Sequence, residues 1–538
     1  MEVPLGQRGN VAWDLVGDPE RADRVAVHFV SARAEHRAIS FGELHRRSSQ
    51  GAALLRAQGL GKGDRVVSVI PRIPAFYDAL LSCMKVGAVA MPGTNLLTAG
   101  DLAYRIRRAG AKAVIVHEAH AAKIEEIAES CPSLEHRFVI GGPRSGWIDW
   151  TAELDSASPL ARTDAPDFAP SDPMLVYFTS GTTAHPKMVT RDYAYAYAHA
   201  LTGRHWMDLR EGDVHWTITD TGWAKAAWGL LFPQWLCGAS AVLFEGSSGF
   251  DPYRHLGLLQ DLGVTTFCAP PTVYRMFAQI DLGFYDFSRL RRSLSAGEPL
   301  NPEAIRVWMA ATGHAPADGY GQTESICLVA NQPGMELRPG SMGRPLPGLD
   351  VRLVDDAGTE VADGEVGHIA VRLPSGAVPT DASVDDWPPG LFRGYEDDPD
   401  GQACFDHGHY YTGDTATRDA DGYIWFVGRS DDVISSAGYR ISPFEVESAL
   451  QEHPAVMESA VVAKPDPLRG HIVVAFVALT EGTEGSGQLA EDIQDHVKRT
   501  TAPFKYPREI YFVDELPKTV SGKIRRVQLR QSLEVTDG

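Results

Sequence analysis

The chain has 538 residues, of which 44% are hydrophobic and 22% are charged, and its formal net charge is −20. A chain of this length is too long to fold around one ordinary hydrophobic core, which predicts two or more domains. The composition is that of a globular protein, and the acidic balance argues against a nucleic-acid partner, whose phosphates would be repelled. A local cluster of lysines and arginines would still accept an anionic substrate.

Targeting and redox signals are few. Asp14, Asp18, Glu20 and Asp23 interrupt the first thirty residues, which argues against a signal peptide, and no apolar run has the length of a membrane span. The six cysteines show no CxxC spacing and lie mostly in apolar contexts. They favour buried free thiols in a reducing cytoplasm over a disulfide framework or a metal site.

The first half of the chain alternates helix and strand patterns. Ser40-Phe-Gly-Glu43 is a capping-box pattern that opens a helix, and Gly59 can close it. Predicted strands separated by helical segments lie at 65–70, 88–91, 113–117, 173–178 and 265–269. Such alternation indicates βαβ units and a mostly parallel sheet.

The second half changes in texture. From about residue 340, short strands at 351–355 and 367–372 are punctuated by Gly and Asp, which predicts a β-rich subdomain. The last part predicts a compact α+β unit with helices at 443–451 and 489–499 and strands at 458–463, 472–479 and 509–513. We therefore predict an α/β fold with a large N-terminal domain, 1–430, and a small α+β C-terminal domain, 431–538.

One loop has the chemistry of a phosphate site. The stretch YFTSGTTAHPK (177–187) collects hydroxyls, a glycine and a lysine directly after a predicted strand. Backbone N–H groups, hydroxyls and a lysine suit a phosphate, although the loop Gly-x4-Gly-Lys-Ser/Thr occurs nowhere in the chain. A polar surface turn is the alternative for this loop alone. The residues concerned are Thr179, Ser180, Gly181, Thr182, Thr183 and Lys187.

Further stretches carry groups that suit a nucleotide. SAGE (295–298) precedes DGYGQTE (318–324), where a ring, a hydroxyl and a carboxylate suit a base, a phosphate and Mg²⁺. YTGD (411–414) and Gly428-Arg429 place a carboxylate and a guanidinium where ribose hydroxyls would bind. PKTVSGK (517–523) ends in a lysine on a glycine turn. Each stretch alone would be an ordinary turn or solvated surface.

Together and in this order, the motifs resemble those of the adenylate-forming superfamily of acyl-CoA synthetases, nonribosomal-peptide adenylation domains and luciferases. The resemblance covers about residues 30–530 and is closest to medium-chain acyl-CoA synthetases. The closer match rests on YFTSGTTAHPKM, DTGWAKAAWG, CAPPTVYRM, YGQTES, SSAGYRISPFEVE and TAPFKYPREIYFVDELPKTVSGKIRR. One departure is Ala184, where the family loop usually has glycine; alanine reaches φ > 0 less freely, so we expect a modest effect on ATP binding.

This resemblance implies a reaction in two halves. A carboxylate attacks the α-phosphate of MgATP to give an acyl-adenylate and pyrophosphate, and the thiol of coenzyme A then displaces AMP. Lys523 would bridge the carboxylate and the α-phosphate, Thr323 would hold that phosphate, and Glu324 would bind Mg²⁺. The loop at 179–187 would grip the β- and γ-phosphates. The remaining predicted ATP contacts are Gly297, Glu298, Asp318, Gly319, Tyr320 (stacked on adenine), Gly321, Gln322, and, at the ribose, Asp414 and Arg429.

The resemblance also implies a mobile C-terminal lid domain that pivots at Asp431. Its rotation would exchange the Lys523 loop for the segment at 436–440. Gly438, Tyr439 and Arg440 would then meet coenzyme A. Candidates for its phosphates are Arg469, Lys505 and Arg508, and ordinary solvated charge is the alternative for these three.

The acyl pocket is predicted from one position. Acetate-specific relatives carry tryptophan where this chain has Gly321, so we expect an open floor, with Trp223 as the apolar wall and Trp228 as a weaker candidate. A medium-chain fatty or aryl acid is the expected substrate. ATP, Mg²⁺ and coenzyme A complete the expected set of small molecules, and the choice between monomer and homodimer stays open.

Three other functions would use parts of the same scaffold. A stand-alone adenylation enzyme would load an acyl or amino acid onto a carrier protein, yet no carrier domain is expected after residue 538. A luciferase-like oxygenase has no positive support. A catalytically inactive sensor of acyl-adenylates or coenzyme A is disfavoured by the presence of Lys523, Glu324 and Asp414.

Overall fold

The structure is a computed structural model. It describes residues 5–179, 186–246, 249–297, 302–375, 379, 382–396, 401–430, 432–436, 439–467, 469–502, 504–518 and 524–536.

One sheet of the large domain carries the predicted βαβ units. Its spatial order is β19-β9-β8-β4-β3-β5-β6-β7, parallel from β8 to β7 and antiparallel at β8–β9 and β9–β19. The strands are β3 (Arg65–Val69), β4 (Val89–Pro92), β5 (Ala113–His117), β6 (His136–Ile140), β7 (Ile148–Asp149), β8 (Pro173–Thr179), β9 (Lys187–Asp192) and β19 (Tyr395–Glu396). Helices between them include α3 (Ala75–Val86), α4 (Ala99–Ala109), α5 (Glu118–Ile127) and α6 (Trp150–Ser156).

The other large sheet joins a parallel part to the predicted β-rich part. Its order is β17-β18-β21-β22-β16-β15-β14-β13-β12-β10-β11-β1-β2, with β20 beside β21. The strands are β1 (Val25–Val30), β2 (His36–Ser40), β10 (Val214–Thr217), β11 (Ser240–Phe244), β12 (Thr266–Ala269), β13 (Arg292–Ser295), β14 (Ala317–Gly321), β15 (Cys327–Ala330), β16 (Ser341–Pro345), β17 (Val351–Val354), β18 (Gly367–Arg372), β20 (Phe405–Asp406), β21 (His409–Arg418) and β22 (Ile424–Arg429). Helices α9 (Pro252–Asp261), α10 (Pro271–Phe277) and α11 (Pro302–Thr312) belong to its parallel part. The β-rich region is thus confirmed, and β14, β15 and β16 connect it to the parallel strands by antiparallel pairing.

Helix α2 (Phe41–Ala57) follows the predicted local chemistry at both ends. The Ser40 side chain accepts a hydrogen bond from the Glu43 backbone N–H at 3.2 Å, while the Glu43 carboxylate turns to Arg37. Only the serine half of the capping box therefore forms. Gly59 follows the helix with φ of +76°, a conformation that glycine adopts without a Cβ clash.

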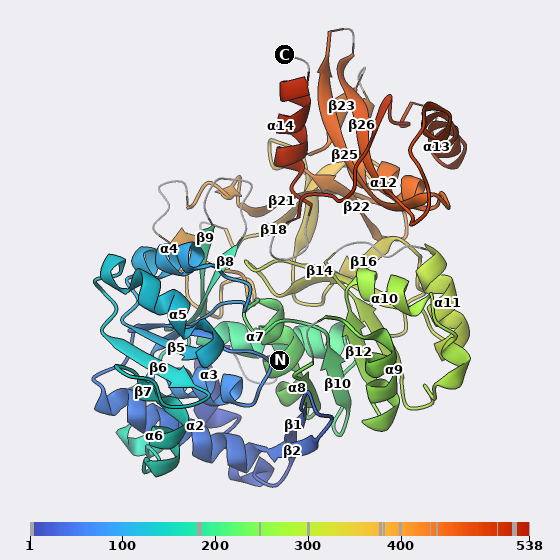
Figure 1. Cartoon of the computed structure of the whole chain (residues 1–538). Helices are drawn as coiled ribbons and strands as arrows, with labels where there is room; N and C mark the ends of the chain where they lie inside the picture. Colours follow the sequence, from blue (N-terminus) through green and yellow to red (C-terminus); the bar gives the residue numbers. More distant parts are fainter. Residues whose placement is uncertain are drawn as a thin grey trace.

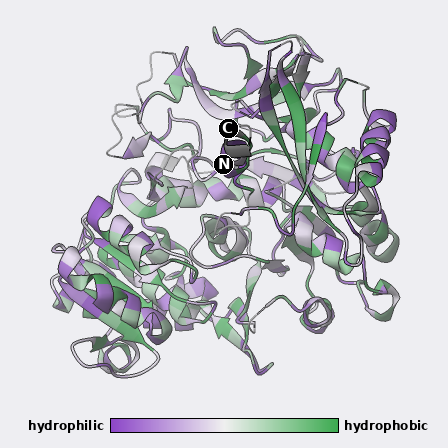
Figure 2. Ribbon diagram, turned by 45° about the horizontal axis from the view of Figure 1, so that its top comes forward, coloured by the Kyte–Doolittle hydropathy of each residue, from purple (hydrophilic) through white to green (hydrophobic). Residues whose placement is uncertain are grey.

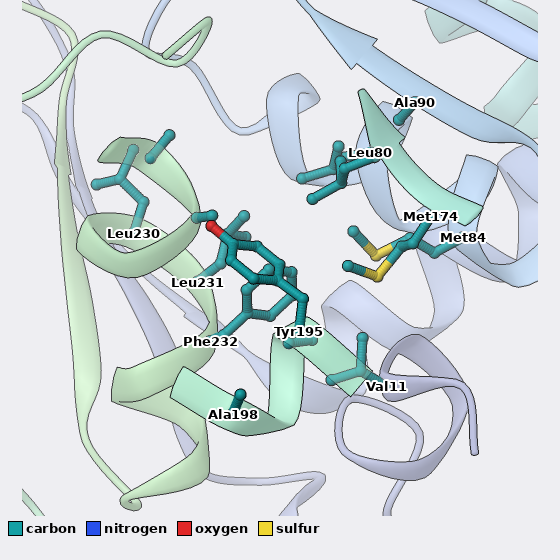
Figure 3. Close-up of a cluster of buried hydrophobic side chains, with 14 of the residues drawn as sticks. Val11, Leu80, Met84, Ala90, Met174, Tyr195, Ala198, Leu230, Leu231 and Phe232 are labelled. Atoms are coloured by element: carbon teal, nitrogen blue, oxygen red, sulfur yellow. The ribbon is translucent and has the colours of Figure 1, made fainter. Parts of the chain in front are cut away.

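The main core lies between the sheets and the central helices. Figure 3 shows Tyr195, from α7 (Tyr193–His205), between Leu231 and Phe232 on one side and Leu80 and Met84 of α3 on the other. Phe232 opens α8 (Phe232–Leu236), and the five residues before it form a π-helix. The Tyr77 hydroxyl donates to the Leu230 carbonyl at 3.1 Å, so this apolar layer also has its buried polar group satisfied.

The small domain lies on the side of the large domain that carries β14, β16, β21 and β22 (Figure 1). It comprises the hairpin β23 (Ile434–Ser436) and β24 (Tyr439–Ile441), the sheet β25 (Val456–Asp466), β26 (Gly470–Leu479) and β27 (Glu509–Phe512), and helices α12 (Pro443–Gln451), α13 (Gly487–Thr500) and α14 (Arg526–Thr536). Its strands carry long hydrophobic stretches (Figure 2), and they supply most of its own apolar core. Sequence patterns predicted each of these elements except the short hairpin, α14 and the exact strand ends.

The sequence predicted free cysteines and no membrane span. All six cysteines are free, four of them buried. Within the described ranges, no helix combines the length and apolar character that crossing a membrane requires.

Candidate active site

The pairing of β21 with β22 brings Asp414 opposite Arg429, as the sequence predicted for a ribose site. The Asp414 side chain is buried, and its Oδ1 lies 3.9 Å from the Arg429 Nε. Its Oδ2 accepts a hydrogen bond from the Tyr320 hydroxyl at 2.5 Å. Burial and the neighbouring Asp414 raise the pKa of Tyr320, so this hydroxyl remains a donor at neutral pH.

Gln322 braces this carboxylate. Its Nε2 donates to Asp414 Oδ2 at 2.7 Å and to the Thr412 carbonyl at 2.9 Å, while its Oε1 accepts from the Tyr410 hydroxyl at 2.9 Å. Both amide hydrogens are therefore engaged within the protein. These bonds favour a positioning role for Gln322 over the direct ATP contact that the sequence predicted.

Glu324, the predicted metal ligand, is also held in place. Its side chain is buried, and its Oε1 accepts a hydrogen bond from the Tyr395 hydroxyl at 2.7 Å. The ammonium of Lys187, which begins β9, lies 4.7 Å from the centre of the Tyr395 ring. One tyrosine thus connects the predicted phosphate-loop lysine to the predicted metal carboxylate.

The backbone of Glu324 has a second support. The buried Arg191 donates to the Glu324 carbonyl at 3.0 Å and to the Gly390 carbonyl, and its guanidinium lies 3.9 Å from the centre of the Tyr195 ring. The Phe392 N–H donates to the same Glu324 carbonyl at 2.8 Å. Both terminal nitrogens of this buried guanidinium thus bind backbone carbonyls, so Arg191 ties β9 and the loop before β19 to the backbone of the metal carboxylate.

The phosphate loop itself is anchored at both ends. Thr179 and Lys187 face each other at the end of the β8–β9 pair. Ser180, Gly181, Thr182, Thr183 and Ala184 lie outside the described residues, as do Glu298, Asp431, Gly438 and Lys523. The backbone of Arg440 lies in β24, and Thr323 is half-buried between Gln322 and Glu324.

The predicted adenine residues gather at the ends of β13 and β14. Gly297 follows β13 with φ of +110° and open space where a Cβ would lie. At Gly319 a Cβ would lie 2.3 Å from Cε2 of Trp206, so only glycine lets β14 pass this indole. Burial raises the pKa of Asp318 to about 8, which keeps its carboxyl protonated at neutral pH.

Gly321 has neighbouring backbone atoms where a side chain would begin. A Cβ at this position would lie 2.5 Å from the Ile326 carbonyl oxygen and 3.1 Å from the Cys327 Cα. The missing side chain therefore allows β14 to approach the backbone beside β15, and it does not leave an open floor in that direction. Trp223 and Trp228 are both half-buried, and the Trp228 ring lies edge-on to Trp206 at 5.2 Å.

The predicted coenzyme A residues whose side chains are described lie in the small domain. The Lys505 ammonium pairs with both Glu445 oxygens at 2.6 and 2.7 Å, and the Arg508 guanidinium lies 4.1 Å from the centre of the Tyr506 ring. Arg469 is exposed. Tyr439, also exposed, stacks on Phe504 at 4.2 Å. The Lys505 ammonium lies 5.7 Å from the centre of the same Phe504 ring, so Tyr439 and Lys505 share a neighbour, while no contact among the described residues joins the Arg469 side chain to them.

Comparison with known proteins decides the family. A model of the AMP-binding enzyme family matches residues 18–378, and a model of the AMP-binding enzyme C-terminal domain matches residues 445–523. The chain belongs to the AMP-binding enzyme family. This finding confirms the predicted membership of the adenylate-forming enzymes.

Individual relatives agree with this assignment. The mitochondrial acyl-coenzyme A synthetase ACSM4 of Rattus norvegicus is 43% identical over 542 residues, covering 98% of this chain and 91% of the relative. ACSM3 of Mus musculus, also an acyl-coenzyme A synthetase, is 40% identical over 523 residues, covering 96% and 88%. The enzyme class predicted from the sequence, an AMP-forming acyl-CoA synthetase, is confirmed.

Solved structures confirm the fold. The anthranilate CoA ligase AuaEII, crystallised with anthranoyl-AMP, has a TM-score of 0.87 at 30% identity and covers 99% of this chain and 98% of its own. An acyl-CoA synthetase of Brucella canis has a TM-score of 0.74 at 35% identity, with coverage of 99% and 96%. The large α/β part and the small C-terminal part are common to them.

Sequence patterns missed the residues that support the site. Tyr395 follows Arg-Gly at the start of the short strand β19, and Arg191 lies four residues after Lys187. In the sequence, each looked only like a polar residue near a motif. Tyr395 and Glu324 are 71 positions apart, and Arg191 and Glu324 are 133 apart. Contacts over such separations are set by the sheet, which local patterns do not determine.

Proposed function

We propose that this acyl-CoA synthetase activates a medium-chain fatty or aryl acid with MgATP and transfers the acyl group to coenzyme A. The observation that carries the proposal is a pair of buried carboxylates held by hydrogen bonds: Asp414 accepts from Tyr320 and Gln322 of the 318–324 motif, and Glu324 of the same motif accepts from Tyr395. The family's chemistry needs a metal carboxylate and a ribose acceptor, and these two carboxylates provide one of each.

The protein's contribution to the first half-reaction is positioning and charge neutralisation. Asp414 and Arg429 hold the ribose, Tyr320 supports the adenine, and Lys187 and the loop after β8 meet the β- and γ-phosphates. Thr323 and Lys523 meet the α-phosphate, where the acid's carboxylate attacks. That carboxylate is already ionised at pH 7, so no side chain needs to remove a proton from it.

The donor set fits Mg²⁺. Magnesium in nucleotide sites is bound by one or two carboxylates together with phosphate oxygens, and Glu324 supplies one buried carboxylate with its orientation held by Tyr395. Within the described ranges, no group of three or more His, Cys, Asp or Glu residues forms a cage for a metal. A bound Mg²⁺ would neutralise charge on the phosphates and orient them.

The substrate class rests on Trp223 and on the relatives. A half-buried indole after β10 provides an apolar wall, and each buried methylene contributes about 0.8 kcal/mol. The anthranilate ligase handles an aryl acid on the same fold, which supports an aryl acid of similar volume as the second candidate. Because the structure places backbone beside Gly321, this glycine no longer contributes to the argument for tail length.

The second half-reaction assigns coenzyme A to the small domain, with Gly438, Tyr439, Arg440, Arg469, Lys505 and Arg508 as its contacts and Asp431 as the pivot. Coenzyme A is favoured over a carrier protein because the relatives over the whole chain are acyl-coenzyme A synthetases. The predicted cytoplasmic location stays a prediction; the two relatives named above are mitochondrial.

The test is a pyrophosphate-release assay over carboxylates of graded length and ring content, with and without coenzyme A. We expect thioester and AMP to form from hexanoate or benzoate when coenzyme A is present, and acetate to be poor. Acetate used at least as well as hexanoate and benzoate would contradict the substrate class. Stoichiometric acyl-adenylate without any thioester would instead support loading of a carrier protein.

A further inference from the structure

The chain segment that carries Lys523 has its two described ends joined to each other. Lys518 and Ile524 form an antiparallel bridge, and the Arg525 N–H donates to the Pro517 carbonyl at 2.8 Å. Lys523 directly precedes the second of these two stems in the sequence. A shift of that stem would therefore move the backbone that carries the predicted catalytic lysine.

The second stem continues into α14, whose first residue binds a buried carboxylate. Arg526 Nη2 lies 2.7 and 2.8 Å from the two oxygens of Glu447, which belongs to α12. The Glu447 side chain is only 7% exposed, and its Oε1 also accepts from the Val461 N–H of β25 at 2.7 Å. A buried charge without partners is costly, so this carboxylate holds its guanidinium firmly. Arg526 thus ties the start of α14 to α12 and to β25, beside which α14 lies in Figure 1.

The same cluster includes the residue that follows the predicted pivot. Asp432 Oδ1 accepts from Arg530, one turn along α14, at 2.8 Å, and Asp432 Oδ2 lies 3.8 Å from Arg526 Nη1. The Asp432 N–H donates to the carbonyl of Arg429, at the end of β22, at 3.0 Å. Because Asp432, Glu447 and Arg526 all follow the predicted pivot in the chain, they would turn together when the small domain rotates.

The ion pair on the first stem is more open to solvent. Lys518 binds the two Glu458 oxygens, each at 2.7 Å, but the side chains are 40% and 24% exposed. Solvated ion pairs contribute little, whereas breaking a buried pair leaves an uncompensated charge. We therefore expect the stem at Arg526, more than the stem at Lys518, to determine where the segment lies.

We propose that Arg526 is a positioning residue for the adenylation step. With Glu447 and Asp432, it holds the stem after Lys523 in one place relative to the pivot, so that rotation of the small domain brings the lysine to the α-phosphate. The inference rests on the proposed function, in which Lys523 meets that phosphate. A misplacement of about 1 Å can slow a reaction about a hundredfold, so a residue that does not touch ATP can still control this step.

The experiment measures the two half-reactions separately in the full-length enzyme, with hexanoate and benzoate as acids. Pyrophosphate exchange reports adenylation, and single-turnover thioester formation from supplied acyl-adenylate reports the second step. We expect Arg526→Gln to lower kcat for exchange by about ten- to a hundredfold, with KM for ATP and the second step unchanged. Arg526→Lys, which restores the charge, should recover part of the rate. Glu509→Gln, at the ion pair with Lys464 in the same domain, is the matched control and should change neither half-reaction.

The selectivity of the loss distinguishes positioning from damage to the fold. A damaged small domain would slow both steps, because the predicted coenzyme A contacts lie on that domain. Equal losses in both steps, or wild-type exchange in Arg526→Gln, would overturn the inference. If Arg526→Gln fails to fold, Glu447→Gln replaces it, since glutamine keeps an oxygen for the Val461 N–H; the absence of a selective loss there would overturn the inference equally. A wild-type enzyme that shows neither exchange nor thioester with any acid would instead contradict the proposed function.

Discussion

The large and the small domain hold their predicted functional residues in opposite ways. In the large domain, Tyr320 and Gln322 bind Asp414, and Tyr395 binds Glu324, at distances between 2.5 and 2.7 Å. In the small domain, Lys505 is engaged by Glu445 and Arg508 by Tyr506, while Arg469 is exposed. Groups that stabilise developing charge work best when they are held in advance. We infer that the large domain is a preorganised nucleotide platform, and that the small domain delivers its groups by moving.

The largest expected effect is that of Lys523, which tests whether the small domain supplies a group that only the adenylation step needs. Lys523→Ala removes the cation predicted to bridge the carboxylate and the α-phosphate, so adenylation should fall by at least about a thousandfold. Thioester formation from supplied acyl-adenylate should survive, because the platform is intact. Pyrophosphate exchange and single-turnover thioester formation measure the two halves separately. An equal loss in both would mean that Lys523 acts on folding or on both steps.

The next effect concerns the closest backbone approach in the platform. Gly321→Ala places a Cβ 2.5 Å from the Ile326 carbonyl oxygen, so the backbone between β14 and β15 must shift. Overpacking of this kind costs about 1–3 kcal/mol, and nucleotide affinity should fall with it. Gly257→Ala is the control, since its Cβ in α9 meets nothing within 4 Å. Thermal unfolding measures the stability of the two variants, and AMP titration measures their nucleotide affinity. A Gly321→Ala variant with wild-type stability and affinity would show that this backbone shifts at little cost.

Tyr395→Phe tests whether the site depends on the hydrogen bond that holds the Glu324 carboxylate. The ring beside Lys187 remains, while Glu324 loses a hydrogen bond at 2.7 Å, so we expect kcat/KM for MgATP to fall about ten- to a hundredfold. The Mg²⁺ concentration for half-maximal rate should rise, which a purely structural defect would not cause.

Tyr411→Phe is the matched control for Tyr395→Phe. Its hydroxyl is buried without a hydrogen-bond partner among the described residues, so removing it should be neutral or stabilising. A similar loss in both variants would show that the effect is unspecific. An unchanged Mg²⁺ dependence in Tyr395→Phe would remove Tyr395 from the metal site.

Sequence patterns predicted elements well where one chain segment contains the whole signal. The strand at 173–178 is β8, and the helix at 443–451 coincides with α12. Helix α14 was missed because its apolar side is narrow: Leu529 and Leu533 are buried with Val462 and Val474 of the β25–β26 pair. Its stability comes from packing on that sheet, which no local periodicity reveals.

For the site, sequence motifs predicted the residues with chemical roles, and the structure added the neighbours that hold or surround them. Asp414 and Arg429 were paired correctly because both belong to one recognisable family pattern, although they lie in strands β21 and β22 and not in the predicted loops. Gly321 was assigned to an open pocket because a missing side chain looks like space in a sequence. The register of β14 on β15 shows that a Cβ at this position would meet a neighbouring backbone.

A smaller effect is expected for the exposed cation of the small domain. Arg469→Ala should raise KM for coenzyme A only about three- to tenfold, because solvated charges interact weakly and are screened by salt. The difference from wild type should shrink as ionic strength increases, while KM for ATP stays unchanged. A loss as large as that of Lys523→Ala would mean that Arg469 belongs to a built site, and the contrast between the two domains would no longer hold.

The smallest expected effect is the change of stability with pH that is caused by the buried carboxyl of Asp318. Burial raises its pKa from 3.8 to about 8, so between these values the folded protein retains a proton that the unfolded chain has lost. Stability from this group is complete below about pH 4 and is lost as pH rises through about 8. Asp318→Asn mimics the protonated form and should flatten the fall in unfolding temperature between pH 5 and about 8, whereas the exposed Asp23→Asn should not. A protonated Asp318 would also donate a hydrogen bond to adenine, so the wild-type KM for ATP should rise above pH 8 and that of Asp318→Asn should not. A wild-type unfolding temperature with the same pH profile as Asp318→Asn would show that this carboxyl is ionised in the folded enzyme.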